Sequence, residues 1–191
     1  MAADPLTPAA KGSSLLALVA ALEAISIWTG RFVSWFSLFM VVITFLVVLL
    51  RYAFDLGWIA MQESVTYMHA ALFMMGAAYT LQHNGHVRVD ILYQKLSPRG
   101  RAWVDLLGTL LLLVPVCGFI AWSGWNYVLE SWDVVEGSRE AGGIPAVYLL
   151  KSLIIAMPIL MLLQGLAWIL RNGLFLSGVE AALPNQGAGN D

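Results

Sequence analysis

The stretch FVSWFSLFMVVITFLVVLL, residues 32–50, contains no Asp, Glu, Lys or Arg. Three further stretches lack the same residue types: 64–87, 106–129 and 152–170. The four stretches are 19, 24, 24 and 19 residues long. A helix rises about 1.5 Å per residue and the hydrocarbon core of a bilayer is about 30 Å thick, so each stretch is long enough to cross once. The sequence therefore predicts an all-α membrane protein, a bundle of four transmembrane helices.

Composition supports one membrane domain. Of 191 residues, 60% are hydrophobic and 12% are charged, and a soluble enzyme would carry roughly twice that charged fraction. The connections are too short for a second domain of about 50 residues. We expect the domain to cover 14–177, between mobile tails at 1–13 and 178–191. The net charge of −2, without a Lys or Arg run, gives no sign of a nucleic-acid partner. The predicted spans are about 32–50, 63–82, 104–128 and 147–170.

Two short amphipathic segments flank these spans. Near the N-terminus, apolar residues at helical spacing predict an interfacial helix or an extension of the first span that is interrupted near Gly30. We do not expect a cleaved signal peptide, because only Lys11 precedes the apolar stretch and Glu23 follows it. Spacing in 87–96 predicts a short helix on the cytoplasmic surface. The apolar face of the N-terminal segment comprises Leu15, Leu18, Val19, Leu22 and Ile25.

The distribution of Lys and Arg predicts an orientation with both termini in the cytoplasm, because these residues are retained on that side. The cytoplasmic set would be Lys11, Arg31, Arg88, Lys95, Arg99, Arg101 and Arg171. The external set would be smaller: Arg51, Arg139 and Lys151. In this orientation the connection between the third and fourth spans is external, and it is acidic. Its acidic residues are Glu130, Asp133, Glu136 and Glu140.

Few polar residues could carry chemistry at membrane depth. Arg51 and Glu63 flank a short external hairpin, where they form an interfacial ion pair or face a partner subunit or a solute path. The four uncharged stretches contain no acidic residue, which argues against a self-contained ion-coupled carrier. No nucleophile elbow or glycine-rich phosphate loop is present, so we expect no enzymatic activity.

The three histidines do not suggest a haem or metal site. His69, His83 and His86 all lie on or just beyond one predicted span, whereas a haem in a helical bundle takes its ligands from facing helices. His69 and His83 would be roughly 21 Å apart along an ideal helix. A structural role is the favoured interpretation, and Cys117, the single cysteine, is expected to be a buried packing residue.

Several short strings give the chain a resemblance to a known family. The most specific is Gly85-His86-Val87-Arg88-Val89-Asp90, and the others occur in order between about residues 30 and 171. Together they resemble the DctQ family, the small membrane subunit of tripartite ATP-independent periplasmic (TRAP) transporters. The other strings are Arg51-Tyr52, Gln62-Glu63, Gly76-Ala77-Ala78-Tyr79, Leu96-Ser97-Pro98-Arg99, Arg101-Ala102-Trp103, Asp105-Leu106-Leu107-Gly108, Pro115, Ser131-Trp132, Glu136-Gly137-Ser138, Ile144-Pro145 and Lys151.

The resemblance implies a subunit of the bacterial inner membrane that does not itself hold the substrate. In the family a large permease subunit carries the sodium and substrate sites, and a periplasmic solute-binding protein delivers an organic acid anion. The small subunit would be a scaffold beside the large one, without a cofactor of its own, and would help to dock the binding protein. Its partners would be these two proteins and the membrane lipids.

The resemblance also suggests roles for particular residues. We expect one group to fix the internal geometry or the contact with the large permease: Arg51, Glu63, His86, Arg88 and Asp90. A second group, in the external acidic segment, would dock the binding protein: Glu136, Ser138, Arg139 and Glu140. Two alternatives stay open: a haem- or quinone-linked anchor of a respiratory enzyme, and a small carrier that works alone. The sequence does not identify the transported substrate.

Overall fold

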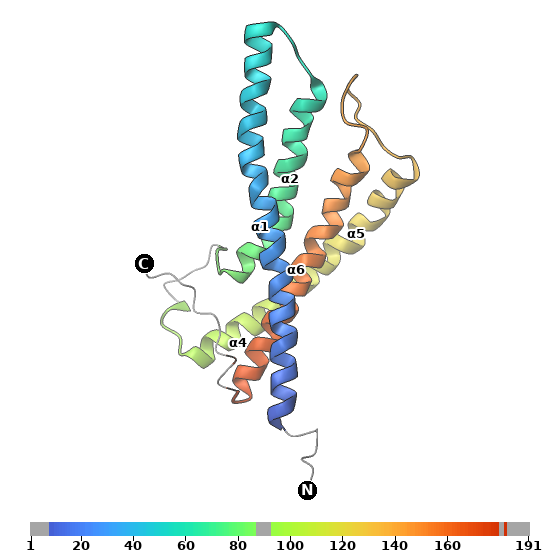
Figure 1. Ribbon diagram of the computed structural model, residues 1–191. Coiled ribbons are helices and arrows are strands. Elements are labelled where there is room, and N and C mark those ends of the chain that lie inside the picture. The colour runs from blue at the N-terminus through green and yellow to red at the C-terminus, as the bar shows by residue number, and fades with distance from the viewer. Residues whose placement is uncertain (1–7, 87–92, 180–181, 183–191) are drawn as a thin grey trace.

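The computed structural model describes residues 8–86, 93–179 and 182, and the regular structure in these parts is helical (Figure 1). A five-residue π-helical segment, η1, joins α4 to α5, so that α4, η1 and α5 form one continuous rod. The elements are α1 (Pro8–Phe54), α2 (Ile59–Gln82), α4 (Pro98–Gly108), η1 (Thr109–Leu113), α5 (Val114–Asp133) and α6 (Val147–Leu176).

Three helical segments are long and apolar enough to cross a membrane: Ser13–Phe54, Pro98–Asp133 and Val147–Leu176. They contain three of the four predicted spans. The remaining one is also a helix, α2, with 24 residues, but Gln62, Glu63 and His69 lower its hydropathy below that of the others. The fold is therefore that of a multi-pass membrane protein.

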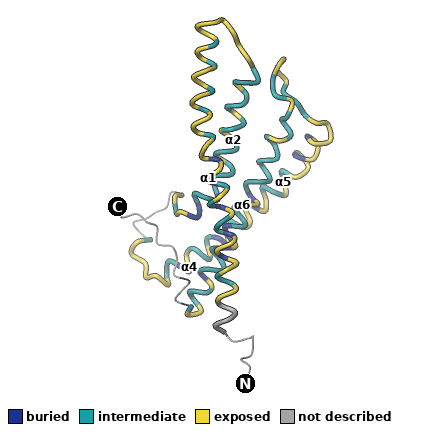
Figure 2. Tube along the Cα trace, viewed as in Figure 1, coloured by how far each residue is buried: buried dark blue, intermediate teal, exposed yellow. Residues whose placement is uncertain are grey.

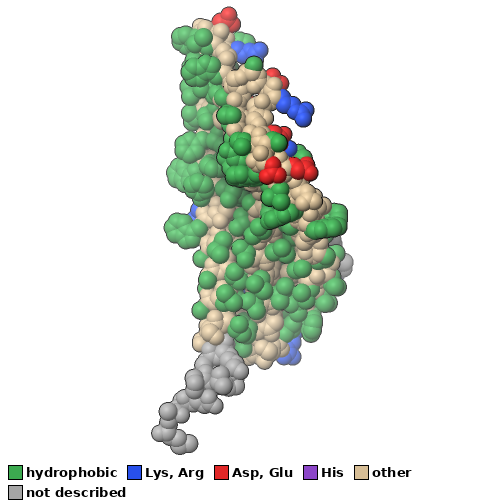
Figure 3. Space-filling view, turned by 90° about the vertical axis from the view of Figure 1, so that its right-hand side faces the viewer, with side chains coloured by type: hydrophobic (Ala, Val, Ile, Leu, Met, Phe, Trp, Pro, Cys, Tyr) green, Lys and Arg blue, Asp and Glu red, His purple; other side chains and the backbone are tan. Residues whose placement is uncertain are grey.

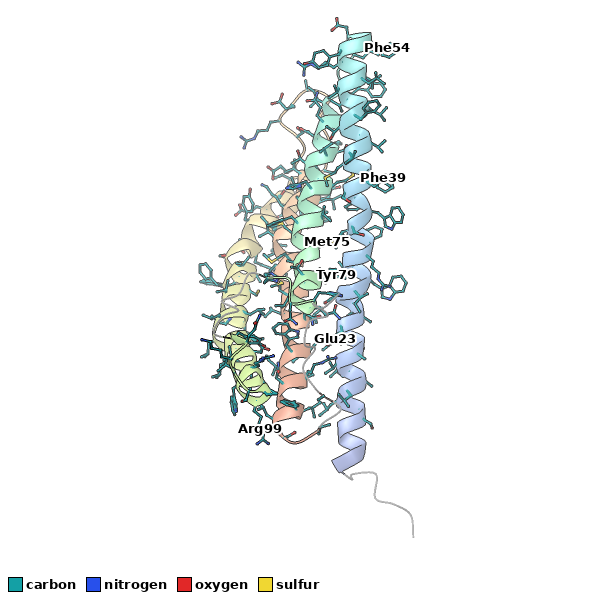
Figure 4. The ribbon with its side chains drawn as sticks, turned by 90° about the vertical axis from the view of Figure 1, so that its left-hand side faces the viewer. Glu23, Phe39, Phe54, Met75, Tyr79 and Arg99 are labelled. Carbon is teal, nitrogen blue, oxygen red and sulfur yellow. The ribbon has the colours of Figure 1, made fainter. Side chains whose placement is uncertain are left out.

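Helix α1 continues without a break through Gly30, so the interruption predicted there is wrong. Gly30 is buried where α1 crosses α2, because a Cβ at this position would lie 2.5 Å from the Tyr79 Cβ. Glycine thus serves close helix contact here and does not break the helix. Figure 4 shows Tyr79 on the side of α2 that faces α1.

In the N-terminal part of α1, fewer apolar residues pack against the other helices than their spacing predicts. Leu18 and Ile25 are exposed, although their spacing predicts that they lie on the packed face. Lipid solvates apolar side chains as well as a protein interior does, so hydrophobicity alone does not mark the packed side of a membrane helix. The packed stripe of α1 is Val19, Leu22, Ser26, Gly30 and Val33.

Helix α6 lies at the centre of the molecule. It contacts α1, α2, α4 and α5, whereas the main contacts of α5 are with α6. In Figure 1, α1 and α2 form one arm and α5 and α6 form another, and the arms diverge toward the end that carries residues 134–146. We call this the loop end, and the opposite end, where α4 begins, the α4 end. The helices therefore pack closely on α6 and spread apart toward the loop end.

The outward faces of the helices are apolar. Figure 2 shows exposed residues along much of α1 and α5. On α1 these include large aromatic residues such as Trp28, Phe32 and Trp35, which are 62–71% exposed. In Figure 4, Phe39 points away from the other helices. Such surfaces are stable only against lipid or another membrane protein.

Candidate functional site

The loop end carries a polar cluster built on two glutamates, Glu63 and Glu136. Helix α5 ends in a turn in which the Glu136 amide donates to the Ser131 carbonyl (2.9 Å) and the Val135 amide donates to the Trp132 carbonyl (3.1 Å). This is the Schellman arrangement of helix ends. Its left-handed residue is Val135, with φ of 46°, where glycine is usual. The turn directs the chain after α5 back toward α6.

Glu136 joins α5 to α6. One of its carboxylate oxygens, Oε2, accepts hydrogen bonds from the Ser131 hydroxyl (2.7 Å) and from the Lys151 ammonium, with which it forms an ion pair. The same ammonium lies 4.0 Å from the centre of the Tyr127 ring, a cation–π contact. The charge of Lys151 is thus neutralised by a residue of the same chain.

Glu63 joins α2 to the loop. Its Oε2 accepts a hydrogen bond from the Ile144 amide (2.7 Å), and its Oε1 accepts one from the Ser138 hydroxyl. The loop is closed on itself as well, because the Ser138 amide donates to the Ile144 carbonyl (3.1 Å). We call this set of three contacts the loop latch. It connects two helical arms that otherwise diverge.

The ion pair considered between Arg51 and Glu63 is not formed, because the Glu63 carboxylate is turned toward the loop and holds Ser138 and Ile144. Arg51 is exposed at the end of α1. Gly143 makes room for the latch, since a Cβ there would lie 2.8 Å from Glu63 Oε1. Glu63 therefore connects α2 to the loop between α5 and α6 within this chain.

The environment of Glu136 lowers the pKa of its carboxyl, first through the hydrogen bond from Lys151 and then through that from Ser131, with smaller help from the charge of Arg139. A lowered pKa in the folded state means that the carboxylate stabilises the fold above its ordinary pKa, and that this contribution is lost as the pH falls through the lowered value. The contribution of Glu136 is therefore present at neutral pH and lost in acid, below roughly pH 4.

Glu136→Gln is accordingly expected to lower the unfolding temperature of the purified protein at pH 7, because the ion pair with Lys151 is lost. At pH 3 the difference between the variant and the unchanged protein should be smaller, since the stabilisation from the ionised carboxylate decreases as the pH falls toward its lowered pKa. Tryptophan fluorescence during heating measures the unfolding temperatures of the two proteins at each pH. An equal difference at the two pH values would contradict this role of the charge.

A second polar cluster lies toward the α4 end, between α1 and α6. The Arg171 guanidinium and the Glu23 carboxylate form an ion pair (2.8 Å). The Ser26 hydroxyl donates to Gln164 Oε1 (2.7 Å), and both of these side chains are fully buried. In Figure 4 Glu23 lies on the inner side of α1. These contacts attach the N-terminal part of α1 to the last helix.

The sequence interpretation misses this second cluster. It places Glu23 at the end of an interfacial segment, although the packed stripe of α1 begins at Val19 and continues through Ser26. A signal is present in the sequence: Glu23 and Arg171 carry opposite charges, and the predicted orientation places both on the same side of the membrane, before the first span and after the fourth. Gln164 has no comparable signal, because no charge or motif marks it.

The structure separates the residues predicted for the site. Glu63, Glu136 and Ser138 meet at the loop end, whereas His86 is exposed near the end of α2, toward the α4 end. Arg88 and Asp90 lie outside the described residues, as does most of the short surface helix predicted over 87–96. The predicted residues therefore do not form a single site.

Within the predicted docking set the side chains divide into two pairs. Glu136 and Ser138 hold internal contacts, whereas Arg139 and Glu140 are exposed at the tip of the loop. On the face drawn in Figure 3 the acidic side chains lie in the upper part of the molecule, with several basic ones, above a largely hydrophobic surface. Only the second pair is free to meet another protein.

No group of three His, Cys, Asp or Glu residues with the geometry of a metal site occurs in the part of the chain that the structure describes. His69 is exposed on α2, and the His83 ring packs against Tyr79, 4.1 Å between ring centres. Cys117 is buried and free. The chemistry that these residues offer is packing and hydrogen bonding.

Comparisons with known proteins agree with the resemblance. Residues 40–173 match the family described as "Tripartite ATP-independent periplasmic transporters, DctQ component". The chain is 33% identical over 86 residues to a protein of Haemophilus influenzae named "Putative TRAP transporter small permease protein". That alignment covers 45% of this chain and 53% of the relative, so the chain spans about half the length of the curated relative it matches. No solved structure matches.

Proposed function

The chain belongs to the DctQ component family of tripartite ATP-independent periplasmic transporters, and from this premise we propose that it is a small permease subunit acting as a membrane scaffold. The family match over residues 40–173 carries the proposal. Its partners would be a large permease subunit, which would hold the sodium and substrate sites, and a periplasmic solute-binding protein. The complex would take up an organic acid anion by sodium symport across a bacterial inner membrane.

The use of charge in this chain supports a scaffold. Partly buried ionic groups in the described residues are already engaged within the subunit: Glu23 with Arg171 and Glu136 with Lys151. Glu63 is likewise bonded to the loop. A carrier needs intramembrane charges that can exchange partners with a solute or an ion. Here these charges attach one element of the fold to another.

The exposed apolar faces of α1 and α5 supply surface for a large membrane partner. Trp122 and Phe119 on α5, like Trp28 on α1, are more than 60% exposed. The loop latch and the Glu23–Arg171 ion pair would keep these two faces at a fixed angle. A large permease subunit that moves during transport would need such a rigid neighbour in the membrane.

We further propose that the tip of the loop contributes to docking of the solute-binding protein. Arg139 and Glu140 are exposed there, and Glu130 and Asp133 are exposed at the adjacent end of α5. The latch would present this group as a preformed surface. Charged groups at the rim of an interface steer association and mainly affect its rate.

Glu140→Lys combined with Asp133→Lys is expected to weaken binding of the cognate solute-binding protein to the reconstituted complex about fivefold at low salt. The effect should nearly vanish at about 1 M salt, where the screening length is about 3 Å. Surface plasmon resonance at several salt concentrations measures this. Arg99→Glu, a charge reversal at the α4 end, is the control.

Equal affinity of the double variant and the unchanged complex at every salt concentration would contradict the docking proposal. Glu136→Lys is unsuitable for this test, because it places a second ammonium beside Lys151 and disrupts the fold itself.

A further inference from the structure

A large apolar groove lies at the α4 end, outside both polar clusters. Its volume is about 980 Å³, and it is bounded by the end of α2, by the α4–η1–α5 rod and by α6. Three of its lining residues carry ionisable side chains, His86, Lys95 and Asp105, and we call the part of the groove that they line its mouth. Its walls are apolar and include Leu81, Val104, Leu112, Val116 and Met161.

The length of the groove limits what can occupy it. On the rod it extends from Val104 to Cys117, which corresponds to roughly 20 Å of helix. Cys117 and Met161 lie near the middle of the Pro98–Asp133 and Val147–Leu176 segments, so the groove ends about halfway across the membrane. A spanning helix of a partner would need a groove of about 30 Å. One leaflet of the hydrocarbon core is about half that thickness, which suits an acyl chain.

The mouth of the groove carries a cation, Lys95, on a turn that Arg101 holds. Arg101 donates hydrogen bonds to the Gln94 carbonyl (2.8 Å) and to the Leu96 carbonyl (3.1 Å), so it holds the turn on both sides of Lys95. The Arg101 guanidinium also lies 5.6 Å from the centre of the Tyr93 ring. Lys95 is exposed, and its ammonium has no ionic partner among the residues that the structure describes.

The acidic residue at the mouth is already engaged. The Tyr93 hydroxyl donates to the Asp105 carboxylate (2.7 Å), so this carboxylate takes part in holding the same turn. Lys95 and the apolar walls thus line one continuous groove. Basic pockets between membrane helices are typical sites for phospholipid headgroups.

We propose that the groove binds a glycerophospholipid, with its phosphate at Lys95 and an acyl chain along Leu112, Val116 and Met161. The lipid would fill the space between the rod and the end of α2. The main contacts of α4 within the protein are with α6 and η1, so the lipid would add a contact toward α2. It would thereby attach the start of the rod to the rest of the fold. This proposal does not depend on the transport function proposed above.

Gly108→Leu tests the channel. Gly108 lines the groove, and a Cβ there meets no atom within 4 Å, so the added side chain of a leucine is expected to extend into the groove. Gly118→Leu is the matched control, because Gly118 has equally open surroundings but lies outside the groove lining. Lys95→Glu tests the phosphate contact, with Arg99→Glu as its control, since Arg99 is exposed at the start of α4 (Figure 4).

The measurement is native mass spectrometry of the full-length protein, purified with any subunits that accompany it and incubated with palmitoyl-oleoyl phosphatidylglycerol. We expect Gly108→Leu to abolish one retained lipid, and Lys95→Glu to reduce its occupancy about fivefold. Both controls should retain it. Glycerol 3-phosphate, which has the phosphate but no acyl chain, should not compete.

Three results would overturn the proposal. The first is wild-type lipid retention by both test variants. The second is competition by glycerol 3-phosphate, which would mean that the mouth binds free phosphate esters. The third is a helix of another subunit in the groove in a cryo-electron microscopy map of the assembled complex.

Discussion

Gly30→Leu is expected to separate α1 from α2 and to lower the free energy of unfolding by about 2–3 kcal/mol. Even the first carbon of the new side chain would overlap the Tyr79 ring, 2.5 Å from its Cβ, at the place where the two helices cross. Overlap with a ring attached to a packed helix is relieved only by moving that helix. Unfolding in increasing concentrations of sodium dodecyl sulfate, followed by tryptophan fluorescence, measures the loss.

Gly118→Leu separates this effect from helix propensity. Leucine is favoured over glycine in a helix interior, so an open site should tolerate the change or gain from it. Gly118 lies on the exposed face of α5, and a Cβ added there would meet no neighbouring atom within 4 Å. Equal unfolding of the two variants would show that Gly30 does not mark a close helix crossing.

Glu63→Ala is expected to release the loop at the loop end, because the Ile144 amide and the Ser138 hydroxyl lose their acceptor together. Arg139 lies in the middle of this loop and is exposed, so trypsin reports on the release. Hydrogen bonds to a charged acceptor are among the stronger ones in proteins. We expect cleavage after Arg139 to be roughly tenfold faster in the variant than in the unchanged protein.

Gln62→Ala is the matched control for Glu63→Ala. It removes the preceding side chain of α2, which is exposed, and leaves the latch intact. Gly143→Ala should reproduce the effect of Glu63→Ala from the other side, since its Cβ would lie against Glu63 Oε1. If Glu63→Ala and Gln62→Ala are cleaved at equal rates, the loop is held by something other than the latch.

The sequence predicts the helices better than their arrangement. Long uncharged stretches locate the helices, because membrane thickness imposes their length. Periodicity does not identify the packed side of α1, where Leu18 and Ile25 are exposed and the polar residue Ser26 is buried. In lipid, packing depends on small residues and hydrogen bonds, and an apolar stripe gives no information about it.

The contacts within the polar clusters are also only partly predictable from the sequence. The position of Glu63 at the start of α2 marks it as a candidate, but the sequence suggests only an ion pair with Arg51 across the hairpin, or a contact with a partner subunit or a solute path. The actual partners, Ser138 and the Ile144 amide, are more than 70 residues away and include a backbone group. Backbone donors have no signature in a sequence. The Schellman turn at Val135, which brings Glu136 to Lys151, is equally unpredictable from the sequence, because valine is not a residue type that favours the left-handed conformation.

The most direct test of the scaffold proposal is affinity purification of a tagged copy from its native membranes in mild detergent. Mass spectrometry of the copurified proteins and an absorbance spectrum are then measured on the same sample. The proposal predicts a large multi-span permease in stoichiometric amount, with or without a periplasmic solute-binding protein. Recovery of the chain alone, or together with a haem band or a dehydrogenase, would contradict it.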